Sequence, residues 1–463
     1  MPLIPCLSTN KAFPLEPLHS MPPQTPRPSH WSNDLGTSFR NPWPSALAPT
    51  WSELISGGGL LGWAKREDKL ISHERAREIK VVEPDWGMGR GATARSGRGD
   101  KVNGENAKLV AEKEGKGLLM GTWLGHAGAF VEIPLERGKD GMQRSAKLLF
   151  DPIFSGTAGP TAYTGPKRYR KSPCEVDDLP GCDCVFISHN HYDHLDLSSI
   201  QAIMKRFPNA RYFVPLGNKP WFVSTGVPEN QINEMDWWQD IELCPEELSY
   251  EPDEEDAQSR SRLRMTCVPA QHNSGRTGID SGATLWSGWV VEHLVTSQPS
   301  KPDDESTGRV TRKGALYFAG DTGYRRHRTS DAICPVFEEL GKKFGPFDLS
   351  FLPIWRGGSL SFVSWLGLRL HHENIPSALH GSPTDAVAMH LDIKSRNSIG
   401  IHFGTFIGAE HESLEAIIEL ADECEKLGVH LLEDETDDEK GRFGVVDLGE
   451  TIVIEIDELV IVG

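Results

Sequence analysis

The chain has 463 residues, of which 48 are basic and 66 acidic, so its formal net charge is −18. This balance argues against a protein that coats nucleic acid, because nonspecific binding depends on Lys and Arg side chains that neutralise phosphates. An apolar fraction of 38% can supply a sizeable core, which excludes wholesale disorder.

The composition changes twice along the chain and predicts three parts. Residues 1–50 are rich in proline and predict a partly disordered N-terminal arm that can drape over a folded body; in it, Trp43 gives a rigid turn a large apolar anchor. Residues 51–116 predict an N-terminal extension and a linker, the latter rich in glycine and charged residues. Residues 117–463 predict the folded domain. Its acidic stretches at 242–260 and 296–313 are expected to be surface loops, because charge this dense cannot be buried unpaired.

The predicted elements favour a layered fold of the α/β (α+β) class. Helical patterns fall at 196–207, with Asp196 or Ser198 as the N-cap, and at 331–344, 384–393 and 413–427. Strands and helices in both halves fit an αββα sandwich, in which two facing mixed β-sheets carry helices on the outside. A functional site is then expected at one edge, where loops from both sheets converge.

Several features favour an intracellular protein. The chain has no uninterrupted apolar run of about 18 residues that would span a membrane. Its N-terminus lacks the basic start and the apolar run of a secretory signal. The 8 cysteines are few and dispersed, which favours free thiols in a reducing compartment. We therefore expect a cytoplasmic location or a peripheral one on an internal membrane.

A cluster of metal-ligand side chains follows the apolar run 185–187. His189 and His191 can project in the same direction from an extended segment, whereas Asp193 and His194 lie on the turn that enters the first predicted helix. Imidazole and carboxylate ligands at this density suit zinc best. The alternative is a polar surface turn rich in histidine. It is disfavoured because four ligand-type side chains directly follow a strand that is expected to be buried.

Three further candidates each end a predicted strand: His272, Asp321 and His402. Taken singly, a histidine at a strand end is more often structural, and an aspartate before Thr-Gly is usually a turn former. Taken together with the first cluster, they predict a metal centre.

The motif at His189, His191, Asp193 and His194 matches HxHxDH, so the chain resembles the metallo-β-lactamase superfamily. Within the superfamily the chain is similar to the N-acyl-phosphatidylethanolamine-hydrolysing phospholipases D. That narrower resemblance rests on phrases in the same order at 41–44 (NPWP), 123–127 (WLGHA), 150–155 (FDPIFS), 165–169 (GPKRY), 236–238 (DWW), 269–272 (PAQH), 318–324 (FAGDTGY) and 401–406 (IHFGTF). The chain departs from the family pattern at Asn273 and at 355–359 (WRGGS), near the expected substrate side.

The resemblance implies a hydrolase with two Zn²⁺ per chain in residues 117–463. The ligands that it implies are, for one zinc, His189, His191 and His272; for the other, Asp193, His194 and His402; and, bridging both, Asp321. A hydroxide shared by two metals would attack the phosphorus of N-acyl-phosphatidylethanolamine and release N-acylethanolamine and phosphatidic acid.

The resemblance also suggests roles for residues beside the metals. Asp193, Asp321 and His380 would be the catalytic residues. His380 would orient the substrate or transfer a proton, with an ordinary loop histidine as the alternative. His126 would act from outside the ligand set, by bonding a ligand carboxylate or the backbone.

A phospholipid substrate implies peripheral contact with a membrane surface. The apolar segments 59–63 and 359–370 could provide that contact, although core packing is the alternative for both. We expect no nucleic-acid partner, and a homodimer is compatible with the resemblance. Two rival functions stay open. One is a different metallo-β-lactamase-type hydrolase that acts on a lactone, a thioester or a small phosphodiester, and the other is an inactive zinc-binding protein.

Overall fold

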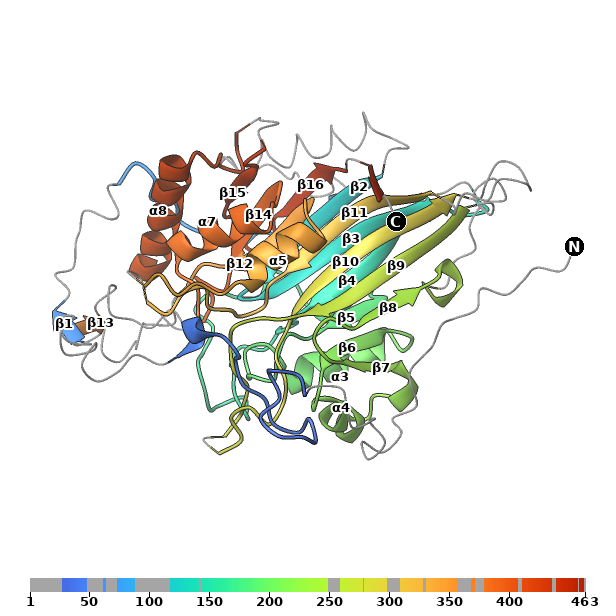
Figure 1. Ribbon diagram of the computed structural model, residues 1–463, viewed down its shortest axis with the longest axis horizontal. Coiled ribbons are helices and arrows are strands. Elements are labelled where there is room, and N and C mark those ends of the chain that lie inside the picture. The colour runs from blue at the N-terminus through green and yellow to red at the C-terminus, as the bar shows by residue number, and fades with distance from the viewer. Residues whose placement is uncertain are drawn as a thin grey trace, which may run out of the picture.

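Two mixed β-sheets face one another in the computed structural model, and helices cover their outer faces (Figure 1). The residues that the structure describes are 27–47, 61–63, 73–87, 117–140, 143–248, 259–277, 279–297, 309–327, 330–355, 368–370, 379–406, 410–434, 439–456 and 458–461. This arrangement confirms the predicted αββα sandwich.

One sheet has the strand order β15-β14-β12-β11-β10-β9-β8, with β17 paired to β11. Strands β8 to β11 pair in antiparallel fashion, whereas β11, β12, β14 and β15 run parallel. The bounds are β8 (Asp240–Leu243), β9 (Ser259–Val268), β10 (Gly288–Ser297), β11 (Val310–Phe318), β12 (Leu349–Pro353), β14 (Asn397–Ile401), β15 (Arg442–Gly444) and β17 (Leu459–Ile461).

The other sheet has the order β16-β2-β3-β4-β5-β6-β7. Its first four strands in this order are antiparallel, and β4 to β7 are parallel. The bounds are β2 (Leu118–Gly125), β3 (Gly128–Arg137), β4 (Gln143–Phe150), β5 (Cys184–Phe186), β6 (Arg211–Pro215), β7 (Ile232–Met235) and β16 (Thr451–Glu455).

Aromatic side chains join the inner faces of the two sheets. The Phe150 ring stacks on Phe318 at 4.8 Å between centroids, and Phe186 meets Trp289 edge-on at 5.4 Å. All four are fully buried. Aromatic pairs of this kind add packing energy beyond the area that they bury. They hold the sheets together close to the strand ends that carry the predicted ligands.

The helices lie outside the sheets, in agreement with the predicted layers (Figure 1). Asp196 is the N-cap of α3 and accepts a hydrogen bond from Ser199 N. The predicted helix at 331–344 begins only at Val336, because Ile333 forms a β-bridge with Arg325. The bounds are α3 (Leu197–Arg206), α4 (Lys219–Thr225), α5 (Val336–Lys343), α7 (Pro383–Asp392) and α8 (Glu410–Leu427), with 3₁₀ turns η2 (Pro44–Ala46), η3 (Val176–Asp178), η4 (Glu229–Gln231) and η5 (Pro245–Leu248).

Three other expectations concern segments outside the sandwich or the cysteines. The apolar segments 59–63 and 359–370 lie mostly outside the described residues, but β1 (Leu61–Trp63) and β13 (Leu368–Leu370) pair in antiparallel fashion. Six cysteines are free and buried, whereas Cys244 is disulfide-bonded, so the expectation of free thiols is wrong there. Among the described residues, no helix is both long and apolar enough to cross a bilayer.

Candidate metal centre

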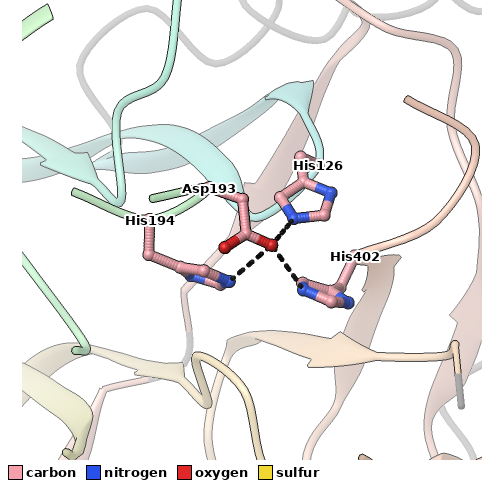
Figure 2. A group of neighbouring side chains, drawn as sticks. All are labelled: His126, Asp193, His194 and His402. Atoms are coloured by element: carbon pink, nitrogen blue, oxygen red, sulfur yellow. Dashed lines mark hydrogen bonds and ion pairs between the residues drawn. The ribbon is translucent and has the colours of Figure 1, made fainter. Parts of the chain in front are cut away.

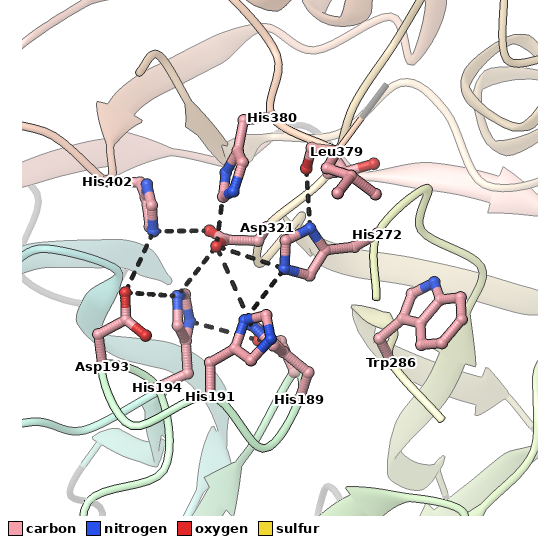
Figure 3. A network of polar contacts seen from close by, with 12 residues as sticks. His189, His191, Asp193, His194, His272, Trp286, Asp321, Leu379, His380 and His402 are labelled. Atoms are coloured by element: carbon pink, nitrogen blue, oxygen red, sulfur yellow. Dashed lines mark hydrogen bonds and ion pairs between the residues drawn. The ribbon is translucent and has the colours of Figure 1, made fainter. Parts of the chain in front are cut away.

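All of the predicted ligands lie at one edge of the sandwich, where strands of both sheets end (Figure 3). The loop between β5 and α3 carries four of them, while His272, Asp321 and His402 follow β9, β11 and β14. Strands β9, β11 and β14 run in the same direction, so their carboxyl ends share an edge. The topology therefore brings residues together that are up to 213 positions apart, counted from His189 to His402.

His189, His191 and His272 form the first group of ligand atoms. His191 Nδ1 lies 2.8 Å from His189 Nε2 and 3.3 Å from His272 Nε2. In a tetrahedral zinc site, bonds of about 2.0–2.1 Å place neighbouring nitrogens about 3.3 Å apart. Three imidazole nitrogens at this spacing can hold one ion.

Asp193, His194 and His402 form the second group, and His126 lies with them (Figure 2). Asp193 Oδ2 is 3.8 Å from Nε2 of both His194 and His402. The same oxygen accepts a hydrogen bond of 2.8 Å from His126 Nε2. A carboxylate and two imidazoles therefore converge on one place, and His126 orients the carboxylate.

Asp321 lies between the two groups. Its Oδ2 atom is 3.2 Å from His194 Nε2 and 3.7 Å from His272 Nε2, while its Oδ1 atom is 3.0 Å from His402 Nε2. One carboxylate thus reaches ligands of both groups, which is the position of a group that bridges two metals (Figure 3).

Hydrogen bonds behind the centre turn the ligand atoms inward. His272 Nδ1 donates to Leu379 O at 2.8 Å, and His194 Nδ1 donates to Asp151 Oδ2 at 2.7 Å. Each bond fixes the proton on Nδ1 and leaves the Nε2 lone pair facing the centre.

Several inward atoms have no hydrogen-bond partner among the described residues. They are buried and comprise His194 Nε2, Asp321 Oδ1 and His402 Nε2. Buried polar atoms are almost always satisfied, so a cluster of orphaned ones calls for an explanation. Nitrogen and oxygen donors aimed at one space fit a divalent transition metal such as zinc.

The pKa values separate the two groups. Burial lowers the pKa of His189 and His272 well below the usual range, which keeps both imidazoles neutral, as a metal ligand must be. Burial also acts to lower the pKa of His402, but Asp321 and Asp193 together outweigh it and raise that pKa to about 9. Burial acts to raise the pKa of Asp321, but His194 and His402 hold it well below its usual range. The buried carboxylate thus draws positive charge around it, which a metal cation would supply.

The backbone is strained at this edge. His126 has φ of 53°, Asp151 of 38° and His402 of 62°, in the left-handed region that few side chains adopt. Such positions cost about 1–3 kcal/mol each and cluster at functional sites. Two hydrogen bonds stabilise the left-handed backbone of His126 and His402. His126 N donates to Thr405 Oγ1 at 2.7 Å, and His402 N donates to His126 O at 2.9 Å.

His380 lies just before α7 and points toward Asp321 (Figure 3). Its Nδ1 atom is 3.7 Å from Asp321 Oδ2, and its ring centroid is 5.0 Å from that of His272. Burial lowers the pKa of His380 to about 4, so the ring is neutral at pH 7. His380 is partly exposed, unlike Asp321, and can therefore reach a bound molecule.

Two residues that the sequence did not single out support the loop of four ligands. Asp151, directly after β4, accepts hydrogen bonds from Ser188 N and from His194. Its position at a strand end is the same signal that marks Asp321. Arg276 donates to Asn190 O at 2.6 Å and also to Leu195 O, across the loop. Nothing in the local sequence marks Arg276.

Comparisons with known proteins show what this chain is similar to. The family model described as the beta-lactamase superfamily domain matches residues 146–403. An N-acyl-phosphatidylethanolamine-hydrolysing phospholipase D of Caenorhabditis elegans is 32% identical over 72% of this chain and 75% of its own. A protein of Mycobacterium tuberculosis is 32% identical over 65% of this chain and 63% of its own. The mitochondrial N-acyl-phosphatidylethanolamine-hydrolysing phospholipase D of Saccharomyces cerevisiae is 26% identical over 64% of this chain and 50% of its own.

The two facing sheets, the donor set and the family match define a metal-dependent hydrolase of the metallo-β-lactamase superfamily. Within the superfamily, the chain belongs to the family of N-acyl-phosphatidylethanolamine-hydrolysing phospholipases D. The resemblance stated from the motifs is confirmed.

Proposed function

We propose that the chain is a zinc-dependent phosphodiesterase of phospholipase D type, which hydrolyses N-acyl-phosphatidylethanolamine to N-acylethanolamine and phosphatidic acid. The observation that carries the proposal is the place of Asp321 between two groups of ligand atoms. The names of the C. elegans and yeast relatives support the choice of substrate.

Seven residues would hold the metals. His189, His191 and His272 would bind one zinc; Asp193, His194 and His402 would bind the other; and Asp321 would touch both. When bound, two zinc ions would supply an activated water near neutral pH and would neutralise charge on the phosphate oxygens.

The residues of the chain prepare this chemistry. Asp151 and Leu379 O keep the Nε2 atoms of His194 and His272 free of protons, and His126 holds the carboxylate of Asp193. His380, neutral at pH 7, would hydrogen-bond a polar group of the substrate and orient it. A cationic role does not suit His380, because its pKa is only about 4.

A lipid substrate also needs contact with a bilayer, and we propose peripheral association through apolar surface. Binding to neutral liposomes that persists at high salt supports this idea, because salt screens charge but leaves apolar contact. A chain that stays in solution with such liposomes at low and high salt argues against it. We also propose a homodimer, which sedimentation of the same preparation tests.

The test of the function is incubation of the purified protein with N-acyl-phosphatidylethanolamine, followed by measurement of N-acylethanolamine release. The Asp321→Asn variant should lose release. The matched control is Asp348→Asn, a change at an equally buried carboxylate that bonds Ala315 N and Arg396 away from the centre; it should keep release. Hydrolysis of soluble esters or lactones without any release from the phospholipid would instead point to another hydrolase of the superfamily. Release that survives Asp321→Asn would contradict the proposal.

A further inference from the structure

The segment 27–47, which we call the strap, lies across the edge of the sandwich that carries the metal centre. We infer that the strap is part of the metal centre, with Asn41 as a positioning residue for the ligand His272. The inference rests on the zinc centre of the proposed function and does not depend on the lipid substrate.

The strap is anchored to the body beside the end of β7. His30 Nε2 lies 2.7 Å from Asp236 Oδ1, and Trp31 Nε1 donates to the other oxygen of the same carboxylate at 3.1 Å. The Trp43 ring stacks on Trp237 at 5.4 Å. Charged and aromatic contacts at both ends of the strap thus hold it in one place.

The register of the strap is also defined. Phe39 N donates to Gly282 O at 2.8 Å, and Gly282 has φ of 71°. A Cβ atom at Gly282 would lie 2.6 Å from Phe39 O, so glycine is needed for this close approach. Two residues further along, the strap meets the loop after β9, which carries Gln271 and His272.

Asn41 and Ser45 make the contacts with that loop. Asn41 Nδ2 donates to the backbone carbonyl of His272 at 2.7 Å. Ser45 Oγ donates to Gln271 Oε1 at 2.5 Å, and both of these residues are fully buried. A buried pair of polar groups is costly to separate, because each would lose its partner without gaining water. The strap therefore behaves as a fixed wall of the loop and not as a loosely attached tail.

Gln271 in turn contacts the loop that carries Asp321. Gln271 N donates to Thr322 Oγ1 at 2.9 Å, and Gly323 N donates to Gln271 O at 2.7 Å. Thr322 and Gly323 directly follow Asp321 in the chain. Asn41 thus holds the backbone of one proposed zinc ligand directly. Ser45 acts through Gln271 on the two residues that follow a second one, Asp321.

The consequence is a specific effect on one metal. If the carbonyl of His272 is released, its imidazole can drift from the position that Leu379 O defines, while Asp193, His194 and His402 keep their supports. Groups that orient a ligand typically contribute 10-fold to 100-fold in metal affinity.

The test compares full-length Asn41→Asp with full-length Asn33→Asp. The first change removes the N–H donor at nearly constant shape. Asn33 lies in the same strap, and its side chain bonds Thr37 and no other described residue, so Asn33→Asp is the matched control. Competition with a chelator measures the affinity of each zinc, and the absorption of the Co²⁺-substituted protein reports on the ligand geometry. Unfolding of the metal-free chains shows that each variant folds. Ser45→Ala is the second variant and gives the same readout if Asn41→Asp does not fold.

In Asn41→Asp we expect one of two zinc ions to bind about 10-fold more weakly, with an altered Co²⁺ spectrum, while the other zinc is unchanged. Asn33→Asp should bind both as the wild type does. If Asn41→Asp or Ser45→Ala binds two zinc ions with the affinity and spectrum of the wild type, the role of the strap is wrong. The two-zinc centre itself would not be affected by that result. A wild-type chain that binds no zinc would overturn the two-zinc centre as well.

Discussion

Replacement of Asp151 by asparagine should weaken metal binding by His194 although His194 itself is unchanged. Asp151 is fully buried. One of its oxygens accepts from Ser188 N at 2.7 Å, and the other accepts from Ser188 Oγ at 2.5 Å and from His194 Nδ1 at 2.7 Å. Since a backbone N–H can only donate, the single oxygen of the substituted side chain has to stay with Ser188 N. The amide NH₂ then faces the ring of His194.

The protonation of that ring has to change as a result. His194 Nδ1 becomes an acceptor, so its proton moves to Nε2, the atom that faces Asp321 at 3.2 Å and would bind the metal. Loss of an outer partner of a ligating histidine typically costs 10-fold to 100-fold in metal affinity, which corresponds to about 1.4–2.7 kcal/mol. Loss of a buried charged hydrogen bond also lowers the free energy of unfolding by about 1.5–3 kcal/mol.

Chelator competition and denaturant unfolding of the metal-free chain separate the two effects. Asp151→Asn should bind one zinc at least 10-fold more weakly and should unfold at lower denaturant. Asp348→Asn, the same change at a buried carboxylate of the other sheet, should lose stability only. If Asp151→Asn keeps wild-type affinity for every zinc while its stability falls, the orienting role assigned to Asp151 is wrong.

Three further predictions use other parts of the structure. Arg276→Lys loses the paired donation to Asn190 O and Leu195 O, so zinc content after dialysis against a chelator should fall. An unchanged zinc content would show that Arg276 does not support the metal centre. His380→Gln should lower turnover of N-acyl-phosphatidylethanolamine at least 10-fold with zinc content intact, because a misplaced substrate can cost about 100-fold in rate. Loss of zinc would instead make His380 a ligand. Burial lowers the pKa of His390 to about 4, against about 6.5 in an unfolded chain. On acidification the unfolded state therefore binds the proton first. The free energy of unfolding should fall as pH drops from about 6.5 to about 4, by about 3 kcal/mol in total. Denaturant unfolding of metal-free His390→Gln across this range should depend less on pH than that of the wild type, and equal slopes would contradict the assignment.

The candidate ligands could be brought together from the sequence because most of them follow one rule. Four of them lie shortly after the end of a strand, and in this fold the strand ends meet at one edge: His189, His272, Asp321 and His402. The spacing of His189, His191, Asp193 and His194 adds a local signature. Only the assignment of individual ligands to two metals required the resemblance to known hydrolases.

The supporting residues are of another kind. Asp151 obeys the strand-end rule, but a buried carboxylate behind a histidine looks in sequence like any other aspartate before proline. Arg276 and Asn41 act by donating hydrogen bonds to backbone carbonyls. Every residue has such a carbonyl, so the sequence does not indicate which one they bond. Their partners became visible only when the fold placed position 41 beside position 272 and position 276 beside position 190. The late start of α5 has the same origin, since a bridge between Arg325 and Ile333 overrides the helical pattern there.

Hydrolysis of N-acyl-phosphatidylethanolamine in ¹⁸O-labelled water tests the central claim most directly. Attack of activated water on phosphorus breaks the bond between phosphorus and the ethanolamine oxygen. We therefore predict one ¹⁸O atom in phosphatidic acid and none in the N-acylethanolamine. Label in the N-acylethanolamine, or no release of either product by the zinc-loaded chain, would contradict it.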